Sequence, residues 1–253
     1  MAGAQAVGAV GAVSRTTPAE ILRSLAFYAA FYGGTVLFVL LACLSMPFSG
    51  RVFRSVVEGW SRWHRGCVNR LLGIRVNSEG LIPRSGAIVA MKHESFFEAI
   101  DLPNLIEHPA IFAKAELLAI PLWGRAAAKY GVVAVERDQG ARTLRTMIGR
   151  AREMAAQRRI LAIFPEGTRV PHGTERALQS GFAGLYKMLG LPVVPVAVDS
   201  GRLYHRRWKR RGTITYRVGE PIEPGLPRAE MEARVLRAIN ALNGCQQRRT
   251  VID

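Results

Sequence analysis

The stretch AIVAMKHESFFEAID, residues 87–101, joins a short apolar run to a polar turn and then to a helix signal. The run AIVAM is continuously apolar, as expected for a strand that is buried on both faces of a sheet. Ser95 and Glu98 have the spacing of a capping box, in which the serine starts a helix and the glutamate bonds back to it. The stretch therefore predicts a strand, a turn and a helix, with His93 just outside the helix.

Short apolar runs of the same kind recur along the chain and alternate with longer helical patterns. The runs are AIFA (110–113), VVAV (132–135), ILAIF (160–164), VVPVAV (193–198) and TITYRV (213–218). Helical patterns cover residues 142–157, 179–189 and 227–242, whereas NSEG (77–80) is typical of a polar turn. This alternation predicts an α/β fold with a mixed, largely parallel sheet flanked by helices, in one domain over residues 74–253.

The N-terminal region is apolar and has no charged residue from Ser24 to Gly50. Leu25–Leu44 is long enough to cross a ~30 Å hydrocarbon core, because a helix rises ~1.5 Å per residue. Arginines flank the run on both sides, so they do not choose an orientation, and one interpretation is a helix that enters one leaflet and returns. A cleaved export signal is an alternative. We expect a disordered N-terminus at residues 1–20 and a membrane-associated helical segment at 21–73.

Within that segment, residues 51–73 form an amphipathic pattern with two alternative interpretations. Apolar residues recur at near-helical spacing with arginines between them, which suits a helix lying in the membrane interface. The same pattern suits an ordinary helix packed on the domain.

Charge and cysteine content limit the classes of partner. The chain of 253 residues has 35 Lys and Arg against 19 Asp and Glu, a formal charge of +16. Such a surface attracts nucleic acid or anionic lipid, and the apolar N-terminal region favours lipid. The basic cluster RLYHRRWKRR (202–211) is either a solvated loop or part of that surface. The three cysteines have neither disulfide nor metal-ligand spacing, so we predict no metal site.

Three features follow predicted strands, where α/β folds usually place their ligand sites. They are His93, Lys114 and the sequence FPEGTR at 164–169. A histidine oriented by a carboxylate can remove a proton from a hydroxyl group. Spacing alone leaves several carboxylates as its partner, and they are Glu94, Glu98, Asp101 and Glu107. In FPEGTR, glycine permits close backbone approach and arginine can grip phosphate, although a plain turn with Glu166 paired to Arg169 fits equally.

Taken in order, these features resemble the glycerolipid acyltransferases of the lysophosphatidic acid acyltransferase type. That family has a His-x4-Asp box, a block containing lysine, a PEGTR block and a proline-centred block. The counterparts here are KHESFFE, FAKAELLAIPLWG (112–124), FPEGTR and LPVVPVAV (191–198), which together span roughly residues 85–200. Two positions depart from the family pattern: Glu98 replaces the usual aspartate, and Lys92 replaces a common asparagine.

The resemblance implies a role for each matching residue. His93 would be the base and Glu98 would orient it, the family interval of five residues favouring Glu98 over the other carboxylates. Lys114 and Arg169 would hold the acceptor phosphate. The remaining implied substrate-binding residues are Glu166, Gly167 and Thr168, which would shape the pocket, and Pro195 on the side of the acyl donor. Neither the motifs nor the resemblance identifies the oxyanion donors, and our hypothesis is that backbone N–H groups near residues 166–169 supply them.

The resemblance also implies partners and a location. The reaction needs no cofactor, because an acyl thioester of coenzyme A or acyl carrier protein is the co-substrate, and lysophosphatidic acid is the acceptor. We expect an enzyme of a bacterial-type inner membrane with its active site facing the cytoplasm, in contact with anionic lipids and not with nucleic acid. The alternatives are the same chemistry on another lyso-lipid, such as a lyso-ornithine lipid, and a non-catalytic basic protein that binds membranes or nucleic acid.

Overall fold

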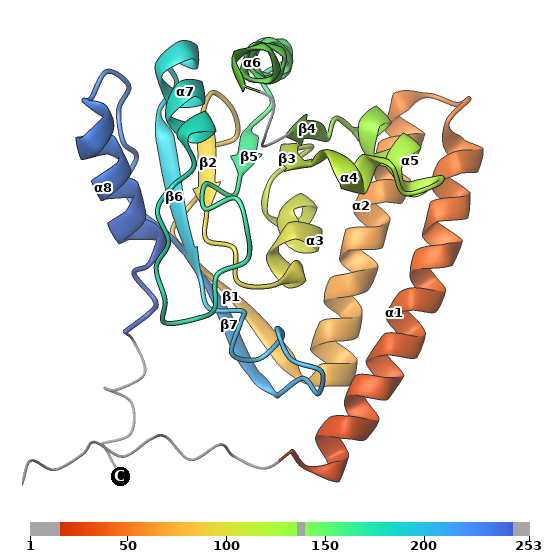
Figure 1. Cartoon of the computed structure of the whole chain (residues 1–253). Coiled ribbons are helices and arrows are strands. Elements are labelled where there is room, and N and C mark those ends of the chain that lie inside the picture. The colour runs from red at the N-terminus through yellow and green to blue at the C-terminus, as the bar shows by residue number, and fades with distance from the viewer. Residues whose placement is uncertain (1–15, 136–139, 245–253) are drawn as a thin grey trace, which may run out of the picture.

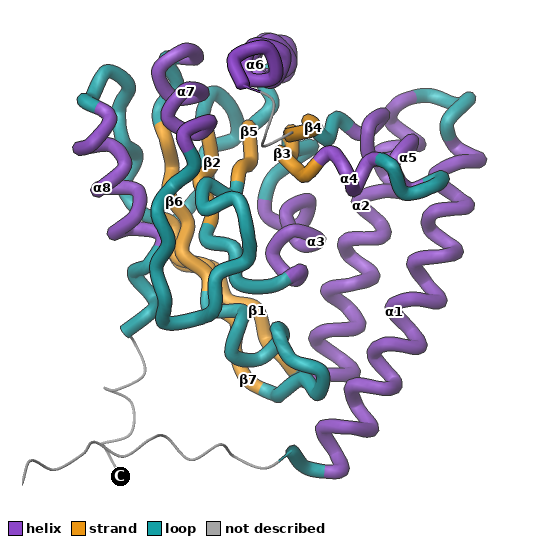
Figure 2. Tube along the Cα trace, in the orientation of Figure 1, coloured by secondary structure: helices purple, strands orange, loops and turns teal. Residues whose placement is uncertain are grey.

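A sheet of seven strands forms the centre of the computed structural model, which describes residues 16–135 and 140–244, and helices cover both of its faces (Figures 1 and 2). The strand order is β1-β7-β6-β2-β5-β3-β4, and every neighbouring pair is parallel except β6 and β7. The strands are β1 (Ile74–Glu79), β2 (Ile88–Met91), β3 (Ala110–Lys114), β4 (Val133–Val135), β5 (Leu161–Ile163), β6 (Val193–Val198) and β7 (Gly212–Val218). The predicted mixed, largely parallel α/β sheet is confirmed.

Strand β1 corrects one sequence prediction. Residues 77–80 were expected to be a polar turn, but Asn77–Glu79 continue β1 and pair in parallel with Thr215–Arg217 of β7. β1 is an edge strand with its last three residues exposed. Polar side chains therefore face solvent while the backbone groups are satisfied by β7, a pattern that apolar periodicity does not detect.

The helices in the described residues are α1 (Pro18–Ser45), α2 (Gly50–Cys67), α3 (Phe96–Leu105), α4 (Ala115–Leu118), α5 (Trp123–Tyr130), α6 (Gly140–Ala156), α7 (Ser180–Leu189) and α8 (Arg228–Ile239). The sequence patterns did not predict α4 and α5, and they place the others within a few residues. A π-helical turn, Val68–Leu72, extends α2.

Strand β2 shows why the apolar runs are continuous. Ile88 and Ala90 belong to the core that faces α6, α7 and α8, whereas Val89 and Met91 belong to the core that faces α1, α2 and α3. All four residues are buried. Successive strand residues point to opposite faces, so a strand covered on both sides needs apolar residues at every position.

The first two helices form an antiparallel hairpin beside the sheet (Figure 1). α1 begins at Pro18, before the expected boundary at residue 21, because Thr17 caps it through a capping box with Glu20. Residues 1–15, which were expected to be disordered, lie outside the described residues. The pair Gly33-Gly34 does not interrupt α1.

α1 has one face toward the protein and another exposed. Phe27 and Phe31 lie in the core, whereas Leu37, Leu40 and Leu44 are about half exposed or more. Within the described residues, α1 is the one helix long and apolar enough to cross a membrane by length and composition, with 17% of its most apolar window buried.

α2 packs on the domain, as one of its two predicted interpretations requires. Ser61 donates to the carbonyl of Ile100 at 2.7 Å, and Arg65 binds Asp101 of α3. His64 is fully buried between α1 and the segment that follows β6, where its Nε2 lies 2.9 Å from the Tyr204 hydroxyl.

The hairpin contact at Gly34 gives a testable prediction. A Cβ placed on Gly34 would lie 2.1 Å from Trp63 Nε1, which donates a hydrogen bond to the carbonyl of Ala30 at 3.2 Å. We expect Gly34→Ala to displace the indole and reduce the free energy of unfolding by about 1–3 kcal/mol. Thermal denaturation in detergent, followed by tryptophan fluorescence, measures the loss.

The neighbouring glycine is the matched control. A Cβ on Gly33 meets nothing within 4 Å. Because alanine is the better helix former by about 0.5–1 kcal/mol, Gly33→Ala should preserve or raise stability. Equal stabilities for the two variants would contradict the close contact between α1 and Trp63.

Candidate active site

The predicted site residues lie at the carboxyl ends of three adjacent parallel strands. His93 follows β2, the turn Glu166–Arg169 follows β5, and Lys114 ends β3. β5 lies between β2 and β3 in the sheet. His93 and the turn therefore come from neighbouring strands, whereas Lys114 is two strands, or roughly 10 Å, away from β2.

Ser95 starts α3 as the capping-box pattern predicts. Its hydroxyl accepts the N–H of Phe97 at 3.1 Å, and Glu98 accepts the Ser95 N–H at 2.6 Å. His93 is two residues before the cap, in extended chain leaving β2. The position outside the helix lets the imidazole turn back toward the first helical turn.

Glu98 is the carboxylate that His93 contacts. His93 donates Nδ1–H to Glu98 Oε1 at 3.0 Å, and the Glu94 N–H donates to the same oxygen at 2.6 Å. The second oxygen accepts from the hydroxyl groups of Ser200 at 2.6 Å and Ser95 at 3.0 Å. The cap and the His93 contact therefore coexist on one carboxylate.

The environment of Glu98 keeps it ionised. Its side chain has no exposed surface. Burial alone would raise its pKa, but the hydrogen bond and charge of His93, with the bonds from Ser200 and Ser95, outweigh burial and hold the pKa below its usual value. In the neutral imidazole, an ionised Glu98 favours the tautomer with the proton on Nδ1, and the Nε2 of that tautomer can accept a proton.

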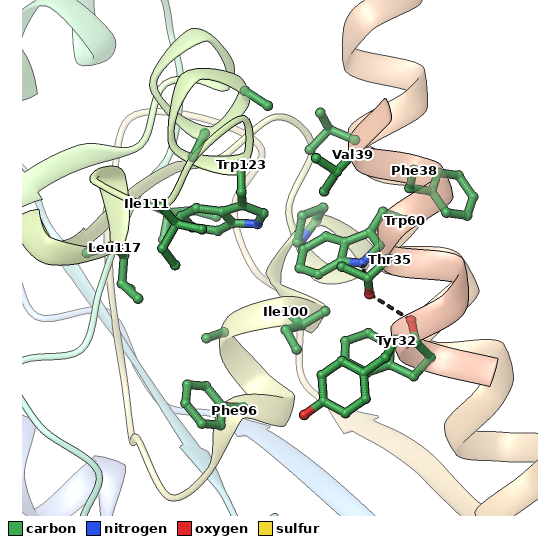
Figure 3. A pocket seen from close by; sticks show the side chains of 18 of the residues that line it. Tyr32, Thr35, Phe38, Val39, Trp60, Phe96, Ile100, Ile111, Leu117 and Trp123 are labelled. Atoms are coloured by element: carbon green, nitrogen blue, oxygen red, sulfur yellow. Dashed lines mark hydrogen bonds between the residues drawn. The ribbon is translucent and has the colours of Figure 1, made fainter. Parts of the chain in front are cut away.

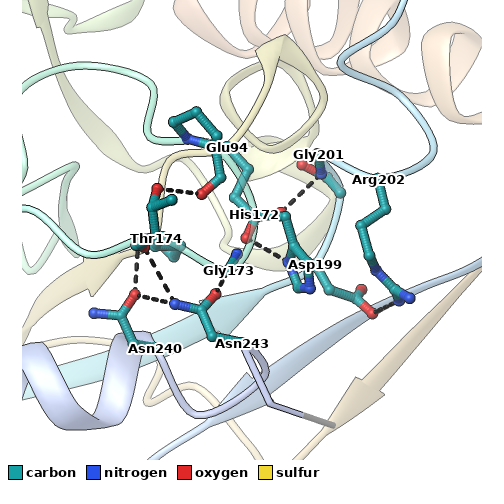
Figure 4. Close-up of polar contacts among 12 residues, drawn as sticks. Glu94, His172, Gly173, Thr174, Asp199, Gly201, Arg202, Asn240 and Asn243 are labelled. Atoms are coloured by element: carbon teal, nitrogen blue, oxygen red, sulfur yellow. Dashed lines mark hydrogen bonds and ion pairs between the residues drawn. The ribbon is translucent and has the colours of Figure 1, made fainter. Parts of the chain in front are cut away.

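The other acidic neighbours of His93 in the sequence have different partners. Glu94 is buried and accepts from His172 Nδ1 at 2.9 Å and from the Gly201 N–H at 2.8 Å (Figure 4). Asp101 binds Arg65 and the Tyr216 hydroxyl. Local spacing could not exclude these carboxylates, because their partners come from distant parts of the chain.

Glu166 lies beneath the site and is fully buried. Its Oε1 accepts from Lys92 Nζ at 2.7 Å, and its Oε2 is 3.4 Å from the His93 backbone nitrogen. Lys92, also fully buried, donates to Asn240 Oδ1 at 2.7 Å and to the Thr174 carbonyl at 2.9 Å. The alternative pairing of Glu166 with Arg169 does not occur. Glu166 supports the backbone that carries His93, so its predicted place against substrate stays a prediction.

The turn after β5 brings Arg169 to the start of α3. Gly167 has φ of 70°, the left-handed region that glycine occupies at little cost, and Thr168 is half-buried beside it. The Val170 N–H donates to the His93 carbonyl at 2.7 Å, which fixes this segment against the His93 backbone. The exposed Arg169 guanidinium stacks on the Phe96 ring, 4.2 Å from its centroid.

Lys114 and Pro195 both belong to strands and not to the loops that carry His93 and Arg169. Lys114 is exposed at the end of β3. Pro195 is buried inside β6, paired with Ala90, and its carbonyl accepts the Gly219 N–H at 2.8 Å. Pro195 thus packs within the sheet, and its role on the side of the acyl donor remains a prediction.

An apolar cavity of about 790 Å³ adjoins the site and was not predicted (Figure 3). It lies between α1 and α2 on one side and α3, α4 and α5 on the other. Figure 3 shows Trp60, Ile100 and Trp123 directed into it, and Phe96, on which Arg169 stacks, also lines it. Trp60 Nε1–H donates to the Thr35 hydroxyl at 3.0 Å, which donates to the Phe31 carbonyl. The wall therefore offers an apolar surface with these polar groups already bonded.

The charged residues that line the cavity all come from one segment, Tyr204–Lys209, after β6. The sequence predicted for this basic cluster a solvated loop or part of a surface for nucleic acid or anionic lipid, and it did not predict a place in a cavity wall. Among the described residues, no group of three or more His, Cys, Asp and Glu side chains is placed to hold a metal ion.

The chain is similar to known acyltransferases in sequence and in fold. A family model described as acyltransferase matches residues 73–199. The 1-acyl-sn-glycerol-3-phosphate acyltransferase of Pseudomonas aeruginosa is 32% identical over 233 residues, covering 88% of this chain and 87% of its own. The lyso-ornithine lipid O-acyltransferase of that organism is 31% identical, covering 71% of this chain and 76% of its own. The crystal structure of the 1-acyl-sn-glycerophosphate (LPA) acyltransferase of Thermotoga maritima has the same fold, with a TM-score of 0.66 at 24% identity. The match covers 89% of this chain and 96% of the Thermotoga chain.

The Lys92–Glu166 ion pair gives a stability prediction. Lys92→Met leaves the Glu166 carboxylate buried without its charge partner, so we expect the free energy of unfolding to fall by about 3–5 kcal/mol. Adding Glu166→Gln should recover at least half of that loss. Chemical denaturation of both variants measures this change. As a control, Lys187→Met, at an exposed position of α7, should stay within about 0.5 kcal/mol of the parent. No recovery in the double variant would contradict the pairing.

Glu98 gives a prediction of pH dependence. Its pKa is depressed in the folded state, so its contribution to stability is complete above the unfolded value near 4.5 and is lost as the pH falls through the folded value. We expect Glu98→Gln to cost about 3 kcal/mol at pH 7, because an amide group then faces N–H donors. The cost should shrink below pH 4.5.

Denaturation of the parent and of Glu98→Gln at several pH values between 3.5 and 7 would measure this cost. Glu153→Gln, an exposed carboxylate on α6, is the matched control and should change little at any pH. A pH-independent cost of Glu98→Gln would show that Glu98 is not ionised in the folded protein.

Proposed function

The chain belongs to the acyltransferase family, and on that premise we propose that it moves a fatty acyl group from an acyl thioester to the free hydroxyl of lysophosphatidic acid, giving phosphatidic acid. The observation that carries the proposal is the His93–Glu98 pair, with Arg169 fixed beside it. The arrangement supplies a base for a hydroxyl group and a cation for an anionic acceptor. The oriented base also argues against a non-catalytic basic protein, which would use cations but would not need a histidine paired with a buried carboxylate.

His93 acts as the general base. Nε2 takes the proton of the acceptor hydroxyl as the oxygen attacks the carbonyl carbon of the thioester. Glu98 stabilises the imidazolium that forms, since its carboxylate stays bonded to Nδ1–H. When the tetrahedral intermediate collapses, the carbon–sulfur bond breaks and the imidazolium returns its proton to the thiolate. An ester and a free thiol are the products.

The turn after β5 is suited to the developing negative charge. The N–H groups of Gly167 and Val170 already donate to the carbonyls of Phe164 and His93. Those of Thr168 and Arg169 are therefore the candidates within the turn for the thioester oxyanion. The Arg169 side chain holds the acceptor phosphate, and Lys114 contributes long-range attraction from the end of β3, the strand next to β5.

The cavity receives an acyl chain. Its size is typical of ligand pockets, and its walls come from Phe38, Val39 and Trp123 among other apolar residues. An acyl chain bound there would have its polar end near Phe96, on which Arg169 stacks. That geometry puts the reacting groups next to His93 while the chain stays out of water.

The apolar N-terminal helix suggests membrane association. We place the protein at a bacterial-type inner membrane with its active site on the cytoplasmic side, because thioesters of coenzyme A and acyl carrier protein are cytoplasmic. Either thioester is a suitable donor. Exposed leucines of α1 and the net charge of +16 favour contact with anionic lipids. The helical hairpin then delivers lipid substrates to residues 74–253, the catalytic domain.

A lyso-ornithine lipid is the second candidate acceptor. It is favoured by the 31% identity with the lyso-ornithine lipid O-acyltransferase, although that match covers less of the chain than the lysophosphatidic acid enzyme does. The same base and thioester chemistry would apply, but Arg169 would then have no phosphate to bind.

An acceptor panel tests the function. Purified protein given a long-chain acyl thioester should release thiol with lysophosphatidic acid at least 10-fold faster than with lyso-ornithine lipid.

His93→Ala should lower kcat by at least about 100-fold, because the general base is removed. His172→Gln is the matched control: His172 also contacts a buried glutamate, but it lies outside the proposed machinery. Full activity of His93→Ala would overturn the base assignment, and no release with any acceptor would overturn the enzyme itself.

A further inference from the structure

The basic segment after β6 is part of the cavity, not only of the surface. Tyr204, His205, Arg206, Arg207 and Lys209 line the same cavity as Phe96 and the apolar residues of α1. The cavity is apolar along its length and cationic where this segment forms its wall. Such a cavity is complementary to a single amphiphile, with a hydrocarbon chain and an anionic head.

α1 and the buried Lys209 hold the backbone of this segment. Tyr28 donates its hydroxyl to the Arg207 carbonyl at 2.6 Å, and the Lys209 N–H donates to the Ser24 hydroxyl at 2.8 Å. Lys209 Nζ donates to the Tyr204 carbonyl at 2.8 Å and lies 3.9 Å from the centre of that ring. These contacts occupy backbone groups and the Lys209 charge, which leaves the side chains of neighbouring residues for other partners.

Arg206 and Arg207 have no ion pair with an Asp or Glu in the described parts of the chain. The Arg207 guanidinium packs on Trp208, 5.0 Å from the ring centroid. Arginine heads of this kind form bidentate bonds with phosphate oxygens.

The segment also lies within electrostatic reach of the catalytic pair. Burial and then the positive charge of Arg169 lower the pKa of His205, and the charges of Glu98 and His93 act on it as well. Arg169 itself stacks on Phe96, another residue of the cavity wall. Positive groups from two separate segments thus converge near one end of the cavity, where an anion would relieve their mutual repulsion.

We propose that His205, Arg206 and Arg207 form a headgroup subsite that, together with Arg169, binds the phosphate monoester of the lyso-lipid acceptor. This inference rests on the proposed function and names residues that select its acceptor. A phosphate held there keeps the free hydroxyl of the same molecule near His93. The subsite favours a phosphate monoester over an uncharged or zwitterionic head, because two arginines and Arg169 face a group that carries up to two negative charges.

The test compares a double variant with a control of equal charge. Arg206→Gln/Arg207→Gln removes two charges from the cavity wall, whereas Arg75→Gln/Arg211→Gln removes two exposed arginines that do not line the cavity. KM and kcat are measured in detergent micelles with 1-oleoyl lysophosphatidic acid and with 1-oleoylglycerol, which lacks only the phosphate. We expect the cavity variant to raise KM for lysophosphatidic acid at least about 10-fold, since charge-assisted bonds are lost.

In the cavity variant, KM for 1-oleoylglycerol and for the acyl thioester should stay within 2-fold of the parent, and the control should match the parent throughout. An unchanged KM for lysophosphatidic acid overturns the subsite. So does a loss that appears only in binding to phosphatidylglycerol vesicles, because the segment would then contact the membrane surface and not the acceptor.

Two further measurements keep the proposal testable if the double variant misfolds or the parent is inactive. Tyr28→Phe retains the ring but removes the bond to the Arg207 carbonyl, and it should raise KM for lysophosphatidic acid several-fold. Equilibrium binding of lysophosphatidic acid, followed by tryptophan fluorescence, needs no turnover. If the parent binds the lipid through Arg206 and Arg207 but transfers no acyl group, the proposed function is contradicted and the subsite is supported. If the parent and the cavity variant bind the lipid equally, the subsite alone is overturned.

Discussion

The buried carboxylate of Glu98 is the constraint on which the site depends. A charge without solvent contact is costly unless hydrogen bonds replace the water, and Glu98 receives them from His93, Ser95, Ser200 and the Glu94 N–H. These donors come from the loop after β2, which ends at the N-cap of α3, and from the segment after β6, whereas Glu98 itself lies in the first turn of α3. The hydrogen bonds to this one carboxylate therefore fix the relative positions of the loop after β2, the start of α3 and the segment after β6. They also favour a single tautomer of neutral His93.

The sequence predicts those parts of the fold and site whose signals are local. A strand covered on both faces must be apolar at each position, so β2 and β6 could be read from short runs, and the Ser95–Glu98 cap could be read from a spacing of three residues. The contact between His93 and Glu98 followed once the family interval selected Glu98. Strand β1 was missed because its stability comes from backbone pairing with β7 and not from an apolar pattern.

Contacts between distant segments account for what the sequence could not supply. Lys92 and Glu166 are 74 residues apart, and nothing near either residue indicates that they pair in the interior. The cavity is assembled from five helices, strand β3 and the segment after β6, so no single stretch carries its signature. The apolar residues of α1 gave a membrane interpretation that is incomplete, because Phe27 and Phe31 face the protein while several leucines remain exposed.

The contacts that hold α1 on the domain can form only late in biosynthesis. Ser24 and Tyr28 leave the ribosome early, but their partners Lys209 and Arg207 lie 185 and 179 residues later. At a translation rate of about 5–20 residues per second, the inner face of α1 waits on the order of 10–40 s for them. Through that interval its apolar surface needs a temporary cover, and the bilayer next to the translating ribosome is the surface chemically suited to provide it. The membrane would then serve the nascent chain as a folding surface before it serves the finished enzyme as a source of lipid.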